Sequence, residues 1–281
     1  MKITIVGLGL IGGSMAIDLK KRKFASYIIG VDNNILHANI ALHNGIVDEI
    51  LTWEKAISKT DIVILAVPVN VAHKILPKIL DALDNQIVTD VCSTKARLAK
   101  LTENHPKRGN YVACHPMAGT ENSGPWAAQS NLFDGKACIL CDVEKTNGTA
   151  KKIVTSMYES LNMRIIQMEA ESHDVHAAYV SHISHISSFA LALTVLEKEN
   201  NEKNIFDLAS GGFDSTVRLA KSNAEMWTPI FMQNHENVLE VLETYIQKLI
   251  GFKDVLQRKS TEEMDQLIFD ANKIRKILNT Q

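Results

Sequence analysis

The sequence has little excess charge, few cysteines and no long apolar run, and each scarcity excludes a class of protein. Its 30 Lys and Arg residues nearly balance 32 Asp and Glu residues, for a formal net charge of −2. Without a long basic run, a nucleic acid is not expected as the main partner, because that binding relies on clustered cations. No apolar run reaches the roughly 18 residues that span a bilayer. The N-terminal segment lacks the basic region and cleavage site of a signal peptide. We expect a cytoplasmic protein with no membrane partner.

The four cysteines do not indicate a metal site. Cys138 and Cys141 form a C-x-x-C within the strand-like segment KACILCD. Residues three apart on a strand point to opposite faces and do not chelate one metal well. Cys92 and Cys114 have no matching spacing. We therefore expect four structural, reduced thiols.

The chain is long enough for two domains, and its pattern changes along the way. Over about the first 165 residues, short β-branched runs alternate with helical patterns, which predicts an α/β fold with a Rossmann-type doubly wound, mostly parallel sheet. The expected strands are 2–7, 27–32, 61–67, 86–91, 111–116, 136–141 and 163–168. After about residue 169, apolar residues recur at helical spacing. We predict one domain over 1–168 and an all-helical C-terminal domain over 169–281.

A glycine-rich segment, TIVGLGLIGGS, joins the first expected strand to the first expected helix. Its spacing is Gly7-x-Gly9-x-x-Gly12. Gly7 permits the tight turn, Gly9 lets the backbone approach a pyrophosphate, and Gly12 allows close packing of helix and strand. The helix N-terminus, which begins near Leu10 and Ile11, supplies N–H groups and a favourable dipole for phosphates. The alternative is a glycine-rich turn in a fold that has lost its nucleotide.

The end of the second strand favours NAD as the dinucleotide. Asp32 lies 20 residues after Gly12 (32 minus 12), where a carboxylate accepts hydrogen bonds from the ribose hydroxyls and repels a 2′-phosphate. Val67 and Pro68 follow the third expected strand. Its carboxyl end faces the cofactor crevice in such sheets, so we expect these two residues to line the cofactor by shape alone.

Two further strand ends carry residues of chemical interest. Ser93, in DVCSTK, is suited either to a substrate hydroxyl or to capping the next helix, and Thr94 is an alternative cap. His115 begins HPMAGTENSG at the end of the following strand, on the same edge as the expected nicotinamide. A dehydrogenase removes a proton as hydride leaves carbon, and histidine suits this because its ordinary pKa lies near neutrality. The alternative is a histidine hydrogen-bonded at a strand end.

Five segments in this order, GLGLIGGS, DVCSTK, HPMAGTENSG, VSHISH and GGFDSTVRLAKSNAEMW, resemble the prephenate dehydrogenase family from residue 1 to about 257. The resemblance implies NAD-dependent oxidative decarboxylation of prephenate to 4-hydroxyphenylpyruvate, in tyrosine biosynthesis. It makes His115 the acceptor of the ring-hydroxyl proton, assisted by Ser93. It also implies that the helical domain binds substrate and forms a homodimer.

The resemblance assigns further residues to the substrate, and the residues themselves leave alternatives open. Arg218 becomes the anchor of a carboxylate, for which a guanidinium fork is suited. His182 and His185 are three apart and so share one helix face; a metal site and an interdomain hydrogen-bond cluster are the alternatives, and we expect no metal. The resemblance gives no role to His173 or His176. The other substrate-binding residues that it implies are Thr120, Glu121, Ser181 and Trp227, of which Glu121 has the alternative of tying down its loop and Trp227 that of a core aromatic.

One departure and three rival interpretations remain. Many relatives carry a Lys-Asp pair where this chain has Asp214-Ser215, so any role of that lysine is absent or rebuilt. Arogenate dehydrogenase is the nearest rival. No acidic residue is obviously offered to the arogenate ammonium, but Glu121 or Asp214 could serve. A β-hydroxyacid or imine dehydrogenase would need a lysine in the helical domain that SHISH does not supply. A regulator that senses NAD without chemistry is disfavoured by His115 and Arg218.

Overall fold

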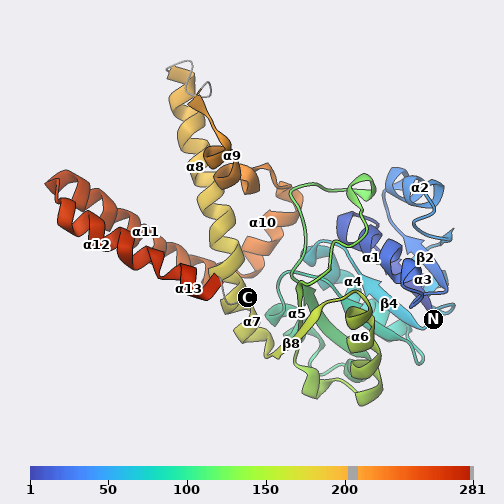
Figure 1. Ribbon diagram of the computed structural model, residues 1–281. Helices are drawn as coiled ribbons and strands as arrows, with labels where there is room; N and C mark the ends of the chain where they lie inside the picture. The colour runs from blue at the N-terminus through green and yellow to red at the C-terminus, as the bar shows by residue number, and fades with distance from the viewer. Residues whose placement is uncertain (202–207, 279–281) are drawn as a thin grey trace. The chain divides into compact units, whose positions relative to one another are not determined.

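The computed structural model describes residues 1–201 and 208–278 (Figure 1). In that part of the chain, eight strands form one sheet in the order β3-β2-β1-β4-β5-β6-β7-β8. Neighbouring strands are parallel except β6 and β7, which pair antiparallel. The strands are β1 (Lys2–Val6), β2 (Tyr27–Val31), β3 (Glu49–Ile50), β4 (Ile62–Leu65), β5 (Ile87–Asp90), β6 (Tyr111–Pro116), β7 (Ala137–Cys141) and β8 (Arg164–Met168). The mostly parallel sheet and all seven expected strands are confirmed. The two-residue β3 is too short to show a periodicity and was not expected.

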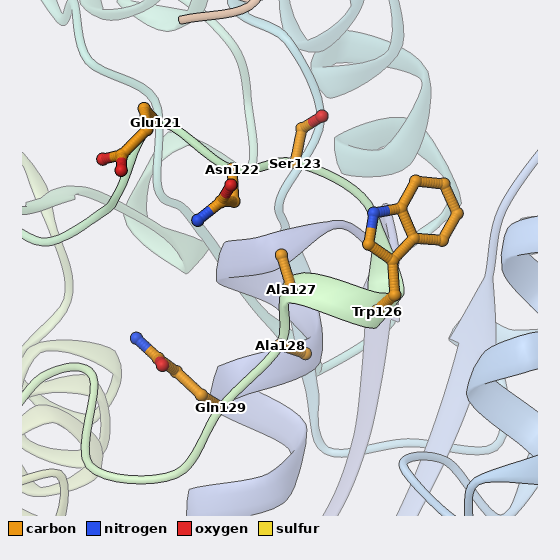
Figure 2. Close-up of a pocket in the computed structure, with 7 residues that line it drawn as sticks. All are labelled: Glu121, Asn122, Ser123, Trp126, Ala127, Ala128 and Gln129. Carbon is orange, nitrogen blue, oxygen red and sulfur yellow. The ribbon is translucent and has the colours of Figure 1, made fainter. Parts of the chain in front are cut away.

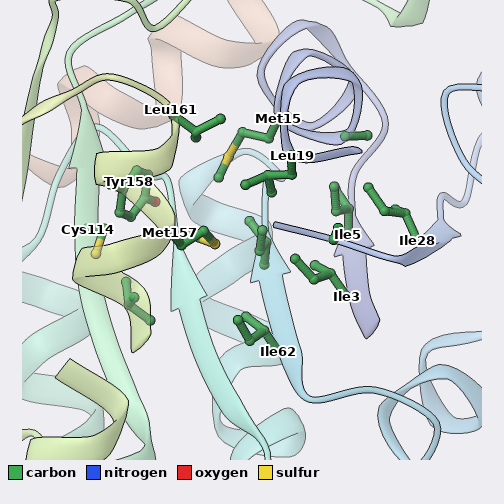
Figure 3. Packing of buried hydrophobic residues seen from close by; sticks show 14 of the residues in the cluster. Ile3, Ile5, Met15, Leu19, Ile28, Ile62, Cys114, Met157, Tyr158 and Leu161 are labelled. Atoms are coloured by element: carbon green, nitrogen blue, oxygen red, sulfur yellow. The ribbon is translucent and has the colours of Figure 1, made fainter. Parts of the chain in front are cut away.

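Helices cover both faces of this sheet, as the alternation of strands and helices predicted. On one face, Met15 and Leu19 from a helix after β1 and Met157 from a helix after β7 pack on strand residues such as Ile3 and Ile5 (Figure 3). On the other face, apolar residues from three helices pack on β4, β5 and β6. The helices of the first face are α1 (Leu10–Lys21), α2 (Ile35–His43) and α6 (Gly148–Ser160), and those of the second are α3 (Trp53–Ile57), α4 (Val69–Ala82) and α5 (Ala96–Thr102).

The C-x-x-C on β7 confirms the period of a strand. Cys138 is buried in the core of the first face and Cys141 in that of the second. All four cysteines are buried and carry free thiols. Burial raises the pKa of the Cys141 thiol well above its ordinary value, so this sulfur is held neutral in the core.

The region after β8 is helical wherever it is described, as predicted. Helix α7 (Ala170–Ala177) runs through a π-helical turn, Ala178–His182, into α8 (Ile183–Asn201). The described chain then continues through α9 (Gly211–Val217), a 3₁₀ turn at Arg218–Lys221, α10 (Ala224–Gln233), α11 (His235–Arg258), α12 (Thr261–Asn272) and α13 (Ile274–Leu278). Shorter 3₁₀ turns occur at Arg108–Asn110, Pro125–Ala127 and Val143–Lys145.

Two compact units emerge from the contacts, Met1–His235 and Glu236–Gln281. The first unit extends beyond the sheet because α7 packs against α5 and α10 packs against α4. Every residue predicted for the site therefore lies within the first unit. The expected domain boundary after residue 168 remains a prediction, since the contacts place the helices from α7 to α10 in the same unit as the sheet.

Within residues 1–201 and 208–278, one helical stretch, Ala170–Glu199, is long and apolar enough to cross a membrane, judged by length and composition only. The sequence alone suggested that no segment reached this limit. The stretch carries His173, Asp174 and His182, all buried against polar or aromatic partners in the first unit. We interpret it as a helix that brings polar side chains to a site.

Candidate active site

The glycine loop has the geometry that its spacing predicts. Gly7 has φ +98°, and a Cβ there would lie 2.3 Å from the carbonyl oxygen of Ala66 at the end of β4. A Cβ at Gly12 would lie 2.0 Å from the carbonyl oxygen of Gly7 and 3.0 Å from the Ile5 side chain on β1, so the helix packs closely on the turn and the strand there. Around Gly9, by contrast, no atom lies within 4 Å of such a Cβ. The turn and the close packing are confirmed, and the space above Gly9 fits a pyrophosphate at the N-terminus of α1.

Asp32 follows β2 directly and holds this loop in place. One oxygen of its carboxylate accepts a 2.8 Å hydrogen bond from the backbone N–H of Leu8, and the other accepts one from Asn34. The side chain is 9% exposed. A carboxylate oxygen has two lone pairs, so both oxygens retain capacity for ribose hydroxyls. Asp32 thus fits the predicted role while also bracing the turn that would carry the phosphates.

The segment after His115 crosses over α1 and lines a groove. The groove has a volume of about 630 Å³ and is bounded by Glu121, Asn122, Ser123, Trp126, Ala127, Ala128 and Gln129 (Figure 2). Glu121 and Trp126 lie at opposite ends of it. The backbone N–H of Gln129 donates to the hydroxyl of Ser14 on α1 at 2.9 Å. The rings of Trp126 and His37 meet edge to face, 5.4 Å apart. This segment therefore connects the end of β6 with α1 and α2.

His115 lies at the end of β6, beyond the carboxyl end of the neighbouring β5, as predicted. Its Nδ1 lies 2.8 Å from Nε2 of His173 on α7. The Nδ1 of His173 in turn lies 2.8 Å from Oδ1 of Asp174. All three side chains are at least 90% buried. Two imidazoles and a carboxylate thus form one hydrogen-bonded row within the first unit.

This row fixes the proton positions. The carboxylate of Asp174 only accepts, so Nδ1 of His173 carries a proton, and the Nε2 of a neutral His173 accepts. His115 must then donate from Nδ1, which leaves its Nε2 with a lone pair. Burial and the neighbouring His173 hold the pKa of His115 well below its ordinary value. His115 is therefore a neutral imidazole at physiological pH, with one nitrogen able to accept a proton.

A second aromatic cluster surrounds the SHISH motif. The rings of His185 and Trp227 stack with centroids 3.4 Å apart, and His182 meets Trp227 edge to face at 6.0 Å. Both histidines therefore share one face, as their spacing predicted. Nδ1 of His182 lies 3.2 Å from the amide of Asn234. Nε2 of His182 and Nε1 of Trp227 are buried and have no hydrogen-bond partner among the described residues. Two buried polar atoms here thus keep an unused hydrogen-bonding capacity.

Charged side chains form two ion pairs next to this cluster. Arg218 donates to the carboxylate of Glu121 at 2.8 Å, and Lys221 donates to Asp214 at 2.8 Å. A backbone hydrogen bond and the Arg218 guanidinium lower the pKa of the Glu121 carboxyl. Arg218 also lowers the pKa of His185, after the larger effect of burial. The structure thus brings Arg218 near both the HPMAGTE segment and the SHISH histidines.

The remaining predicted residues lie around these groups. Ser93 is half-buried in the connection from β5 to α5, and Ser181 is half-buried in the π-helical turn. The hydroxyl of Thr120 accepts a hydrogen bond from the N–H of Asn122 and so shapes its loop. Val67 is half-buried and Pro68 is exposed, both between β4 and α4. Leu10 and Ile11 begin α1 beside the glycine turn, where Leu10 is buried.

Two family models together match most of the chain. "Prephenate dehydrogenase, nucleotide-binding domain" covers residues 15–167, and "Prephenate dehydrogenase, dimerization domain" covers residues 169–269. Prephenate dehydrogenase of Lactococcus lactis is 30% identical over 99% of this chain and 77% of its own length. The chain belongs to the prephenate dehydrogenase family. It is therefore an oxidoreductase with the family's nucleotide-binding domain.

Two solved structures of family members resemble the whole chain. The prephenate dehydrogenase of Aquifex aeolicus, in complex with hydroxyphenyl propionate and NAD⁺, is 32% identical with a TM-score of 0.89, over 99% of this chain and 98% of that one. The arogenate dehydrogenase of Synechocystis is 30% identical with a TM-score of 0.77, over 99% and 100%. The fold is thus shared by members named for either substrate.

Sequence reasoning missed His173 and misjudged the start of α5. The helix cap expected at Ser93 or Thr94 is wrong, because the N-cap is Lys95 and neither hydroxyl caps the helix. The carboxylate of Asp174 takes the N–H groups of Lys95 and Ala96 instead, at 2.7 and 2.9 Å. A partner 79 positions away leaves no local signal. The only sequence hint at His173 was the H-x-x-H spacing that it shares with His176, and His176 is exposed.

Proposed function

We propose that this family member catalyses the NAD-dependent oxidative decarboxylation of prephenate to 4-hydroxyphenylpyruvate. The observation that carries the proposal is the hydrogen-bonded row from Asp174 through His173 to His115. It presents an unprotonated nitrogen at the strand edge where the cofactor is expected. A binding protein without chemistry has no need for a neutral, oriented base at this place.

The chemistry assigns one task to each group. Nε2 of His115 accepts the proton of the ring hydroxyl, while the carbon that bears this hydroxyl gives up a hydride, for which a bound NAD would be the acceptor. The bond to the ring carboxylate then breaks, its electron pair enters the ring, and carbon dioxide leaves. The ring becomes aromatic, and the proton held on His115 returns to the oxygen. His173, anchored by Asp174, holds the His115 ring and keeps its Nε2 free of a proton until the hydroxyl proton arrives. Ser93 is suited to orient the hydroxyl.

The helical side of the site is suited to a dicarboxylate. Arg218 offers a guanidinium fork to one carboxylate of the substrate, and the buried Nε2 of His182 and Nε1 of Trp227 offer polar contacts to the rest. Among the described residues, Arg218 donates to Glu121 through Nη1 alone, so its other N–H groups can meet a substrate carboxylate. Thr120, Ser181 and His185 complete the proposed substrate contacts.

The pairing of the acidic residues favours prephenate over arogenate. Arogenate differs by an ammonium group, which would need a carboxylate partner. Glu121 and Asp214 are the acidic residues next to this part of the site, and each already pairs with a cation, Arg218 or Lys221. Binding the ammonium through either would break an existing ion pair. Prephenate, with a keto group instead, makes no such demand.

NAD is the proposed cofactor, and a homodimer the proposed assembly. Asp32 supports NAD because its charge opposes a 2′-phosphate. The dimer is supported by the dimerization-domain match and by apolar side chains exposed on α8, α11 and α12. These include Leu193, Leu196, Leu239, Leu249, Leu256, Ile268 and Phe269. Light scattering at micromolar concentration tests it, and a monomer mass would refute it. A cytoplasmic location remains a prediction.

The deciding experiment is a matrix of two substrates and two cofactors. Purified protein receives prephenate or arogenate, each with NAD or NADP, and formation of the reduced nicotinamide is followed by absorbance. We expect turnover with prephenate and NAD. Turnover with arogenate alone would refute the substrate but keep the role of His115. Absence of turnover with all four pairs would refute the proposed function.

A further inference from the structure

A lysine is buried beneath the candidate base. Lys95 is 0% exposed, and its Nζ contacts both oxygens of the Asp90 carboxylate. The hydroxyl of Tyr111, also fully buried, donates to the same carboxylate at 2.7 Å. Burial alone would lower the pKa of Lys95, but Asp90 raises it above its ordinary value, so the ammonium stays charged. A buried ion pair contributes little to stability over apolar residues of similar size, so stability alone does not explain it.

Lys95 makes hydrogen bonds to two groups that hold His115 in place. Its Nζ donates at 2.6 Å to the carbonyl oxygen of Cys114, the residue directly before His115, and so holds the strand backbone there. Its backbone N–H donates at 2.7 Å to Oδ1 of Asp174, the oxygen that also contacts His173. One residue therefore holds both the backbone of His115 and the far end of the row that orients its ring.

We propose that Lys95, paired with Asp90, is a positioning residue for His115 in the dehydrogenase reaction. This rests on the proposed function, because it assigns to Lys95 the placing of the base that the function requires. Lys95 itself does not exchange a proton with the substrate. It fixes where Nε2 of His115 lies, and a displacement of about 1 Å at a reacting group lowers a rate by roughly a hundredfold.

The test compares variants that remove equivalent buried contacts at different distances from His115. The double variant Asp90→Asn with Lys95→Met removes both charges together, which avoids leaving one buried and unpaired. Tyr111→Phe is a milder variant that removes one buried hydroxyl from the Asp90 carboxylate. Thr4→Val is its matched control, because Thr4 is equally buried in the sheet and donates to Thr60, away from His115.

Three readouts separate positioning from stability: thermal unfolding, kcat and KM with prephenate and NAD, and the titration of His115 by NMR of histidine-labelled protein. We expect the double variant to lose about tenfold to a hundredfold in kcat, with KM changed by less than about twofold. Its His115 should titrate at higher pH, because a nearby cation is gone. Tyr111→Phe should lower kcat severalfold, whereas Thr4→Val should lower only the melting temperature.

The outcomes are distinguishable. If the double variant and Thr4→Val have the same kcat and the same His115 titration, Lys95 only stabilises the fold and the proposal is wrong. If the double variant does not fold, Tyr111→Phe against Thr4→Val decides, and equal kcat values overturn the proposal. If the unaltered protein turns over neither prephenate nor arogenate, the proposed function fails. The His115 titration then still decides whether Lys95 acts on this ring.

Discussion

Replacement of His173 by alanine should disable the enzyme while leaving its substrate affinity nearly unchanged. The ring of His173 is the sole link between Asp174 and Nδ1 of His115 in the described row, with 2.8 Å contacts on both sides. Its loss frees the His115 ring to rotate and to place its proton on Nε2, the nitrogen that must be unprotonated. His173 contacts no group proposed to bind the substrate carboxylates, so KM should stay within about twofold.

The expected magnitude follows from the bonds that are lost. A hydrogen bond to a charged group contributes about 1.5–3 kcal/mol, and each 1.4 kcal/mol is about tenfold in rate. Loss of the bond that orients His115 should therefore lower kcat by about ten- to a hundredfold. Loss of the correct tautomer can extend this towards about 10⁴-fold, as in the serine protease triad. The acid limb of the pH–rate profile should move to higher pH, because His173 lowers the pKa of His115.

The assay is steady-state formation of NADH at several pH values, with His176→Ala as the matched control. His176 lies on the same helix, three residues further on, and is exposed. Added imidazole should restore part of the activity of His173→Ala, because the substitution opens a buried space of the right shape. The reasoning is refuted if kcat stays within twofold of the unaltered protein, or if His176→Ala loses as much.

Three further predictions follow from the same site. His115→Asn should lower kcat steeply with little change in the Kd for prephenate, and unchanged turnover would refute its role as the proton acceptor. Arg218→Ala should mainly raise KM for prephenate; a defect in kcat alone would mean that Arg218 does not anchor a carboxylate. Burial lowers the pKa of His182 from 6.5 to about 4, so the unfolded chain takes up a proton there before the folded one does. The contribution of His182 to the free energy of unfolding, roughly 3 kcal/mol, should therefore be present above pH 6.5 and be lost as the pH falls to about 4. Urea unfolding at pH 7 and pH 4.5 measures this, and His182→Asn should make the difference smaller by the share of His182. The pKa values of His115 and His185 are also lowered, and these residues keep their own shares.

The local part of this architecture could be predicted from the sequence, and the long-range part could not. Strand alternation, the Gly7-x-Gly9-x-x-Gly12 turn and the opposite faces of Cys138 and Cys141 depend on neighbours within a few residues, and all are present. The position of His115 follows from the rule that parallel strands end at one edge.

The contacts that define the site depend on how α7 packs. His173 lies 58 positions from His115, and no periodicity indicates that the two rings meet. The same packing explains the wrong cap at Ser93 or Thr94, since Asp174 reaches the N-terminus of α5 from another helix. The ion pair of Glu121 and Arg218 joins residues 97 positions apart, and no sequence pattern indicates this contact either. The sequence indicates which segments form helices, but it does not indicate where those helices pack.

The double attachment of Asp174 has a consequence for how this sequence can vary. One oxygen contacts both His173 and the N–H of Lys95, and the other takes the N–H of Ala96. Asparagine keeps one acceptor oxygen but loses the second, and glutamate is longer by one methylene. Both substitutions therefore alter one side chain that serves the start of α5 and the orientation of His115 together. Because one carboxylate serves both the helix start and the base, a substitution at Asp174 affects the two together. We therefore expect Asp174 to be among the least variable positions in active relatives.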